Sequence, residues 1–278
     1  MKSNTQVHRN PSFLELSAAS LLAALALCAS SCGGAPEATR GPVAPANAGS
    51  AQAAPSGVGR ELDEFVGRAE KNPSLLDDRS DERTVGRQAE GLEKRVQASP
   101  AWSTDDVRAS LPSARRLRDR LLEHRPQFEV VLLLRTWATK MAAGVLDAMA
   151  HRAERSTETL SGMNEILSKE DLTDEDIARL AAGTQKLRSG GIGQVDDLPT
   201  KELQELRTSV AALLVAGTNI GYYDDPRVRR AAWEALRAEK KSGLDLSLTV
   251  PHLSQNLEIE EEAPVRELGT TVLAELKQ

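Results

Sequence analysis

The sequence predicts an all-α protein, either an antiparallel multi-helix bundle or a short α-solenoid, that follows a disordered N-terminal tether. Aromatic residues make up only 3% of the 278 residues, and aromatic and β-branched side chains are the usual strand formers. Ala, Leu, Arg and Glu, which favour helices, are abundant. From Gly59 onward, apolar residues also recur every three or four positions, which is the spacing of one helical face.

Three helices are predicted at the start of this body. Apolar residues at helical spacing mark the first two: Leu62, Val66 and Ala69 in the first, and Val85, Ala89, Leu92 and Val96 in the second. Ser80 is the expected cap of the second helix. The third opens at Thr104, with Asp105 and Asp106 in its first turn, where negative charge is favourable. Pro112 should break or kink this third helix.

The longest predicted helix runs from about residue 126 to 168. Two apolar stripes define it, namely Val130, Leu134, Trp137, Met141 and Val145, and then Leu160, Met163 and Leu167. The polar residues 151–159 between the stripes predict a middle that is exposed or kinked. Charged Arg135, Lys140 and Asp147 interrupt the apolar run too early for a membrane span, which needs about 20 apolar residues.

The remaining helices are placed by their caps. Thr173 and Asp176 resemble a capping box, the glycine-rich residues 190–193 should end that helix, and Pro199 stands near the next start. Asp225 and Pro226 form a typical cap and first turn. The apolar stripes of these helices are Ile177, Leu180 and Leu187; Leu203, Leu206, Val210, Leu213 and Ile220; Val228, Ala232 and Leu236; and Val265, Leu268, Val272 and Leu276.

One segment bears on the choice between bundle and solenoid. Residues 225–236, Asp-Pro-Arg-Val-Arg-Arg-Ala-Ala-Trp-Glu-Ala-Leu, resemble the helix pattern of HEAT repeats. Such arrays repeat with a period of about 40 residues. Because no second copy is recognised at that period, the sequence favours a bundle over a HEAT array.

The N-terminus resembles the signal of bacterial lipoproteins. Basic Lys2, His8 and Arg9 precede a 14-residue apolar run, 16–29, which fits the h-region of a signal peptide. Small residues then lead to Cys32, as in the lipobox of that family. The resemblance implies cleavage after residue 31 and lipid on Cys32. Cys28 fits less well because Leu27 stands where a small residue is wanted, and ordinary secretory cleavage after Ser31 or Gly34 is the alternative.

The segment after the cysteine predicts a disordered tether. Residues 32–58 are rich in Ala, Gly, Pro and Ser and almost free of large apolar side chains, so they cannot bury enough surface to offset the entropy of ordering. The expected organisation is therefore a signal peptide (1–31), a tether (32–58) and a helical domain (59–278). Gly33 follows the cysteine, and the absence of Asp there favours the periplasmic face of the outer membrane.

Charge and cysteine content restrict the function classes. The formal net charge is −6, which argues against a general nucleic-acid binder. The cysteines are Cys28 and Cys32, so a domain processed at residue 32 has no internal disulfide. It also has no cysteine-based zinc site or C-x-x-C-H haem attachment. No cofactor is expected.

Candidate catalytic and ligand-binding residues fit structural roles better. Asp196, Asp197, Asp224 and Asp225 lack the alternating spacing of an EF-hand and are expected to cap helices. His124, His151 and His252 lack the paired Glu-x-x-His segments of a di-iron bundle, although His151 and Glu154 share a helical face. The segment 189–193 follows a helix rather than a strand, so it is expected to be a helix-ending loop and not a phosphate-binding loop.

Three surface features remain as possible contacts. The basic run Arg115, Arg116, Arg118, Arg120 and Arg125 could bind anionic headgroups or polysaccharide, but interleaved Asp119 and Glu123 favour a salt-bridged solvent face. The acidic run Glu258, Glu260, Glu261 and Glu262 is expected to be a solvated face too. Tyr222 and Tyr223 could anchor a partner, although a plug at the end of a bundle is favoured.

These observations favour a membrane-anchored envelope lipoprotein whose helical domain binds another envelope protein or acts as a scaffold. An enzymatic role is left open but is not favoured. One alternative is an envelope enzyme that acts on cell-wall or glycan material through carboxylates brought together by the fold. Another is a carrier of lipid or a small ligand, which would need a sizeable apolar cavity.

Overall fold

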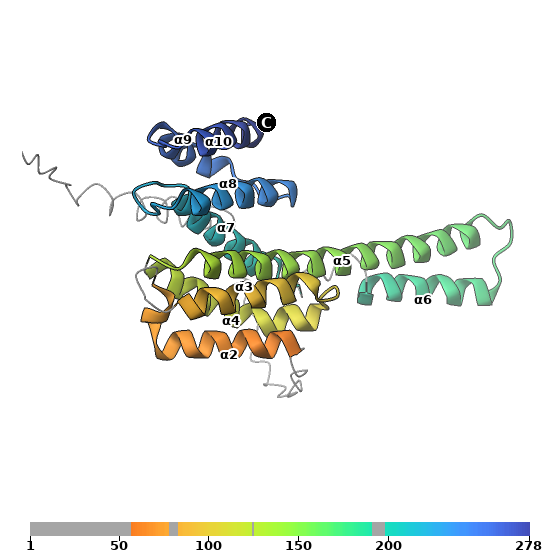
Figure 1. Cartoon of the computed structure of the whole chain (residues 1–278). Coiled ribbons are helices and arrows are strands. Elements are labelled where there is room, and N and C mark those ends of the chain that lie inside the picture. Colours follow the sequence, from red (N-terminus) through yellow and green to blue (C-terminus); the bar gives the residue numbers. More distant parts are fainter. Residues whose placement is uncertain (1–56, 78–82, 124, 191–197) are drawn as a thin grey trace, which may run out of the picture. The chain divides into compact units, whose positions relative to one another are not determined.

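The predicted fold class is confirmed: a computed structural model of the chain is helical throughout the parts it describes, residues 57–77, 83–123, 125–190 and 198–278 (Figure 1). These residues form two compact units that meet within one helix, between Arg207 and Thr208. The predicted signal peptide, almost all of the predicted tether and Cys32 lie outside the described residues.

The N-terminal unit contains a four-helix bundle. It is built from α2 (Gly57–Lys71), α3 (Arg83–Ala98), α4 (Thr104–Glu123) and the first half of α5 (Phe128–Leu167), with the short 3-10 helix η2 (Pro73–Leu76) after α2. Helix α5 packs on α3 and α4, and α2 packs on the same two helices, so each helix contacts two neighbours. The predicted stripes of α2, α3 and the first half of α5 are all buried.

Helix α4 begins at Thr104 as predicted, but the predicted break at Pro112 is wrong. Helix α4 continues through Pro112 rather than breaking there. Pro112 is exposed, whereas Leu111 and Ala114 on the inner face of the helix are buried. Packing of this inner face stabilises the helix on both sides of the proline. The residue before the helix, Ser103, is its N-cap: the Ser103 hydroxyl accepts from the Asp106 N–H at 3.2 Å, and the Ser103 N–H donates to the Asp106 carboxylate at 3.0 Å.

The second half of α5 leaves this bundle and pairs with α6 (Asp174–Gly190) in a helical hairpin, which Figure 1 shows extending beyond α3 and α4. The predicted capping box is confirmed, because the Asp176 N–H donates to the Thr173 hydroxyl at 3.2 Å and the Thr173 N–H donates to the Asp176 carboxylate at 3.2 Å. Helix α6 ends at Gly190, at the start of the segment predicted to stop it.

The C-terminal unit begins with the second half of α7 (Thr200–Gly217) and continues through α8 (Pro226–Lys241), the 3-10 helix η4 (Ser247–Thr249), α9 (Val250–Glu258) and α10 (Ala263–Leu276). Helix α8 packs against α10, and α9 packs against α10. Asn256 of α9 donates to the Val215 carbonyl of α7 at 3.0 Å. Helix α7 ends before Ile220, which the sequence placed in its stripe.

Helices α8 and α10 share one local feature, a Val-Arg pair whose arginine bonds the preceding turn. Val265 and Arg266 follow Val228 and Arg229 by 37 residues. Both arginines donate to a backbone carbonyl six residues upstream, Arg229 to Tyr223 and Arg266 to Glu260, each at 2.9 Å. Helix α10 lacks the Asp-Pro cap and the paired alanines of α8, so the rest of the 225–236 pattern is not repeated there.

Candidate interaction surface

The α5–α6 hairpin is held by a thin seam. The residues of each helix that face the other helix are mostly half-buried, in contrast to the fully buried residues of the bundle: Met149, Arg152, Ser156, Thr159, Met163 and Ile166 on α5, and Asp176, Leu180, Gly183 and Leu187 on α6. Helix contact is close at Gly183, where an added Cβ would lie 2.8 Å from the Met163 sulfur. The Lys169 ammonium bonds the Asp176 carboxylate at 2.6 Å near the hairpin end, which fixes the antiparallel register.

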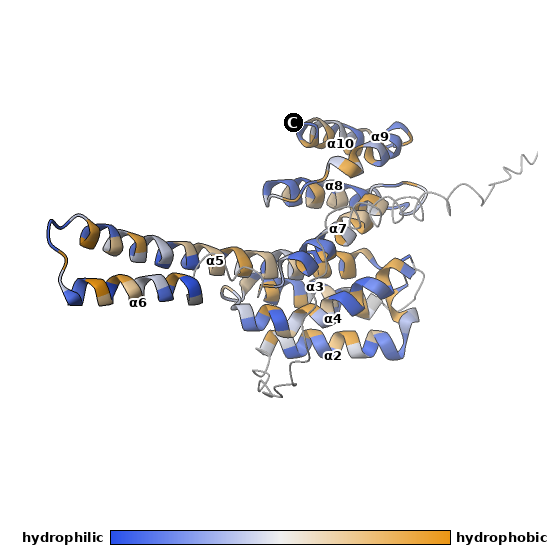
Figure 2. Cartoon of the chain, turned by 180° about the vertical axis from the view of Figure 1, so that it is seen from behind, coloured by the Kyte–Doolittle hydropathy of each residue, from blue (hydrophilic) through white to orange (hydrophobic). Residues whose placement is uncertain are grey.

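Beside this seam, large apolar side chains are exposed. Leu146, Leu160 and Leu167 of α5 are 59%, 46% and 59% exposed, and Ile177 of α6 is 55% exposed. We refer to these four residues as the apolar stripe. Figure 2 shows that apolar residues continue along both helices of the hairpin.

The stripe lies on one side of the hairpin. On α5, Leu160 and Leu167 directly follow the seam residues Thr159 and Ile166, and on α6, Ile177 directly follows Asp176. In heptad terms these are e positions beside a seam of a and d positions. Because the two helices run in opposite directions, their e positions face the same side. Ala153 and Thr184 occupy the remaining e positions of the hairpin, so this side carries no ionisable group at any e position.

The opposite side of the hairpin is basic. Its corresponding positions, g in the same heptads, include Arg155 on α5 and Arg179 and Lys186 on α6. Arg179 pairs with Glu175 at 2.7 Å. The hairpin therefore has one apolar and one charged side. Helices with apolar residues at a, d and e are typical of a bundle with more than two helices.

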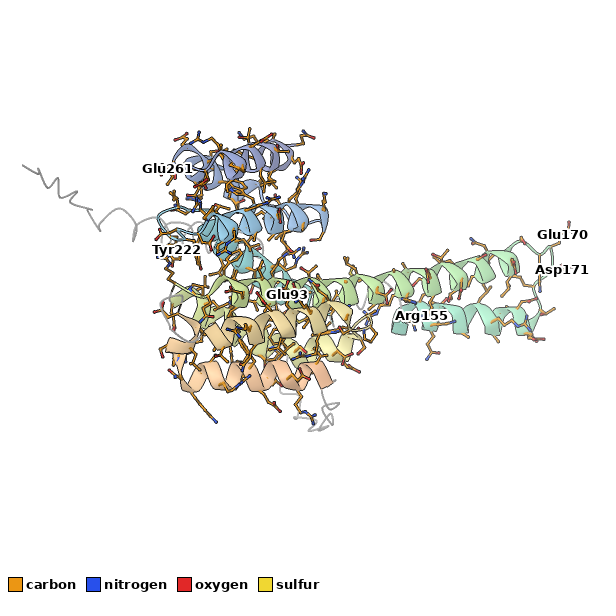
Figure 3. All side chains as sticks on the ribbon, viewed as in Figure 1. Glu93, Arg155, Glu170, Asp171, Tyr222 and Glu261 are labelled. Carbon is orange, nitrogen blue, oxygen red and sulfur yellow. The ribbon has the colours of Figure 1, made fainter. Side chains whose placement is uncertain are left out.

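Charge also varies along the hairpin. Its distal part, residues 160–178, carries six carboxylates and one lysine, whereas the proximal segments 146–159 and 179–190 carry five basic and three acidic residues. Figure 3 shows Glu170 and Asp171 at the tip and Arg155 in the proximal part. The distal part of the hairpin is therefore acidic and its proximal part is weakly basic.

Among the described residues, the predicted carboxylate and histidine candidates are not brought together. Asp196, Asp197 and His124 lie outside the described residues. Asp225 caps α8 as predicted, accepting from the Arg227 N–H at 2.9 Å, and the hydrogen bonds from Arg227 lower the pKa of Asp225. Within the described parts of the chain, no cluster of three His, Cys, Asp or Glu side chains suited to a metal ion is found.

The two described histidines occupy different settings. His151 is exposed on α5, and its Nδ1 lies 2.8 Å from the Asp147 carbonyl oxygen. This backbone contact, followed by the Asp147 carboxylate, raises the pKa of His151. His252 is half-buried on α9, and its Nδ1 is buried with no hydrogen-bond partner among the described residues.

The acidic run near the C-terminus contains the one site residue that the sequence placed wrongly. Glu258, Glu261 and Glu262 are exposed, as predicted, but Glu260 is 1% exposed. Its carboxylate accepts two hydrogen bonds of 2.7 Å from the equally buried Arg229. Burial opposes ionisation of Glu260, but the hydrogen bonds from Arg229 outweigh it and hold the pKa below its usual range. The solvated-face prediction fails at Glu260 because it ignored the buried arginine one helix away.

Two other candidates have structural roles, as predicted. In the basic run of α4, Arg118 pairs with Asp119 at 2.6 Å and Arg120 with Glu123 at 3.2 Å, which confirms the salt-bridged surface. Tyr223 is buried and its ring centroid lies 5.5 Å from that of half-buried Tyr222. Tyr223 therefore acts as the expected plug at the turn before α8.

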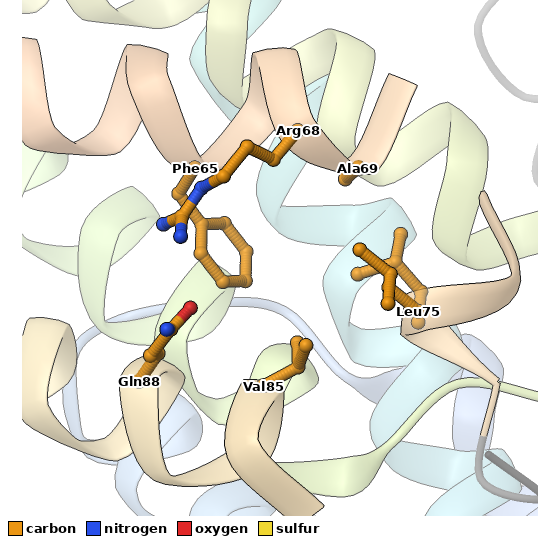
Figure 4. Close-up of a pocket in the computed structure, with 7 residues that line it drawn as sticks. Phe65, Arg68, Ala69, Leu75, Val85 and Gln88 are labelled. Carbon is orange, nitrogen blue, oxygen red and sulfur yellow. The ribbon is translucent and has the colours of Figure 1, made fainter. Parts of the chain in front are cut away.

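Two hollows lie beside α2 and α3. One is a small apolar hollow of about 30 Å³ lined by Phe65, Arg68, Ala69, Leu75, Leu76, Val85 and Gln88 (Figure 4). Small-ligand pockets usually have about 300–1,000 Å³. The other is a shallow polar depression of about 350 Å³, open to solvent, where Glu61 and Arg95 pair at 2.8 Å.

None of the helices in the described residues has the length and apolar character of a membrane span. Comparison with family models, curated proteins and solved structures gives no match to this chain.

The apolar stripe was not predicted as a site, although the sequence carries a signal for it. Leu146, Ala153, Leu160 and Leu167 are spaced seven residues apart along α5. Leu160 and Leu167 were assigned with Met163 to one buried stripe. The distinction between seam and exposed side depends on which helix pairs with α5, and that is visible only in the folded chain.

Proposed function

We propose that this chain is a lipid-anchored protein of the bacterial envelope whose helical body is a non-enzymatic interaction or scaffold domain. The observation that carries the binding role is the apolar stripe on the α5–α6 hairpin. Four large aliphatic side chains about half exposed on one side of a two-helix element are costly in water, because each buried Leu or Ile contributes roughly 1.5–3 kcal/mol. A protein partner that covers them recovers this contribution.

The anchoring part of the proposal is supported by the sequence. Small residues precede Cys32 after a 14-residue apolar run, and an Ala-, Gly-, Pro- and Ser-rich segment of 26 residues, 33–58, follows it. A flexible segment after a lipidated cysteine would let the helical body reach partners away from the bilayer. The envelope and the periplasmic face of the outer membrane are the proposed location, and nucleic acid is not a proposed ligand.

Lipidation of Cys32 is tested by the mass of the mature chain and its partitioning into membranes. We expect an N-terminal Cys32 that carries acyl chains. In a Cys32→Ala variant we expect the unprocessed mass and loss of the lipid. Cys28→Ala is the matched control and should be processed normally. An unmodified N-terminus in the natural chain would reject the anchor.

The binding role is tested separately by site-specific photo-crosslinking in intact cells. A photoreactive residue at Leu160, in the stripe, should give a discrete cross-linked protein product. The same residue at Leu248, which is 53% exposed in the C-terminal unit, should not. Equal labelling at both positions would show that the stripe is not a binding surface.

A further inference from the structure

We infer that the apolar stripe binds the same stripe of a second copy of this chain, with the two hairpins antiparallel and forming a four-helix bundle. This inference rests on the proposed function, because it names the partner of that surface. Large apolar residues at e positions beside a helix seam are typical of bundles with more than two helices, yet the hairpin supplies only two helices. A second hairpin supplies two helices of the same length and pattern.

Charge favours a second copy in the antiparallel arrangement. The distal part of the hairpin has an excess of five negative charges and the proximal part an excess of two positive charges. Two parallel copies would place the acidic distal parts together, where like charges repel. In the antiparallel arrangement the acidic distal part of one copy lies against the basic proximal part of the other, where opposite charges attract. In the antiparallel arrangement the two apolar stripes meet and opposite charges of the two copies face each other.

The spacing of the stripe supports a two-fold axis at the middle of the hairpin. Leu160 and Leu167 lie equally far on either side of Met163 and Asn164. On α6, Ile177 and Thr184 flank Leu180 and Ala181 in the same way, and Met163 contacts Gly183 across the seam. An axis there places Leu160 of one copy against Leu167 of the other. A closed two-fold interface requires such self-complementarity.

The same axis pairs two charged residues beside the stripe. Asp174 and Arg188 of α6 are both exposed, lie on the stripe side, and stand seven residues before and after Ala181. In the antiparallel arrangement Asp174 of one copy faces Arg188 of the other. Asn164 lies next to the axis and so faces its own counterpart.

The first test is the mass of the full chain in solution, measured by sedimentation equilibrium in density-matched detergent. We expect the mass of two chains, and one chain for the double variant Leu160→Glu, Ile177→Glu with unchanged helical circular dichroism. Each charge placed in the apolar contact should raise the dissociation constant at least about tenfold. Leu248→Glu is the matched control and should remain a dimer.

The second test concerns the arrangement of the copies. Asp174→Arg should weaken the dimer, and adding Arg188→Asp should restore it. In a full chain with Cys28→Ser and Cys32→Ser, Asn164→Cys should form a disulfide-linked dimer on oxidation, whereas Thr157→Cys, one heptad away from the axis, should not. A dimer without this rescue and this cross-link pattern would overturn the antiparallel arrangement.

Failure of this inference can be distinguished from failure of the proposed function. A monomeric chain that still cross-links another protein at Leu160 in cells would reject self-association and leave the scaffold role. A monomer without any product at Leu160 would reject both. An unlipidated chain that dimerises as described would reject only the anchor.

Discussion

The buried pair Arg229–Glu260 connects two turns of the C-terminal unit. Both side chains are 1% exposed, and Arg229 also donates to the carbonyl oxygens of Tyr223 and Asp224 at 2.9 and 2.7 Å. Glu260 in turn accepts from the Glu262 N–H at 3.0 Å. The pair therefore joins the turn before α8 to the turn before α10, so each helix pair is held at its connection.

Loss of Arg229 should be far more costly than loss of its neighbour. Arg229→Ala leaves the Glu260 carboxylate buried without its partner, and breaking a buried pair in this way costs about 3–5 kcal/mol. Arg230→Ala removes an exposed pair with Glu234, at 3.0 Å, worth about 0–1 kcal/mol. Urea denaturation of the two variants measures the difference. Equal destabilisation would show that the buried pair does not hold the unit.

The sequence could not reveal this pair at the residue level. Arg229 and Glu260 are 31 residues apart, and each stands among other charged residues that are exposed, such as Arg230 and Glu261. Composition predicts a solvated charge at both positions. Only the approach of α8 and α10 selects which of the charges becomes buried.

At the scale of elements, helical periodicity predicted most helices correctly. It failed where a helix is too short to show a stripe or where packing against other helices keeps it continuous. Helix α9 has only nine residues, with a proline in its first turn and no long stripe, so it was not predicted. Helix α4 was expected to break or kink at Pro112 but is continuous. Propensity is a weak guide where one face of a helix is fully packed.

Close contact between α8 and α10 gives a prediction at this scale. A Cβ at Gly269 of α10 would lie 2.7 Å from Leu257 Cδ1 and 2.9 Å from Trp233 Cε2, and Trp233 is almost fully buried. Gly269→Ala should therefore destabilise the protein by about 1–3 kcal/mol through overpacking.

The matched control is Gly67→Ala in α2, where nothing lies within 4 Å of an added Cβ. Alanine is favoured over glycine inside a helix by up to about 1 kcal/mol, so this variant should be neutral or more stable. Thermal unfolding followed by circular dichroism compares them. A Gly269→Ala protein as stable as Gly67→Ala would mean that α8 and α10 separate without cost.

For the molecule as a whole, the all-helical class followed from composition and periodicity, because both are properties of the chain that tertiary packing does not change. The division at Arg207 and Thr208, inside the continuous helix α7, did not follow. The stripe Leu203, Leu206, Val210 and Leu213 runs across this point without interruption. A boundary within a regular helix has no composition shift that could mark it.

Acid should destabilise the whole molecule, because four described carboxyl groups distributed over both units have lowered pKa values. They are Asp176, Asp225, Asp245 and Glu260. For Asp176, the hydrogen bonds from Lys169 and then Thr173 lower the pKa from 3.8 to about 2. A group whose pKa is lower in the folded state stabilises the fold above its unfolded pKa and loses that contribution as pH falls through the folded value.

For Asp176 the loss should fall between pH 4 and pH 2, and the other three carboxyl groups add to it below their unfolded pKa values. Urea unfolding at pH 7, 5, 4 and 3 should therefore show similar stability at the two higher values and a steep fall below pH 4. Asp176→Asn should be less stable at pH 7 and should lose less stability on acidification, because asparagine does not titrate. An acid dependence as steep as that of the natural chain would show that Asp176 is not ionised in a stabilising contact.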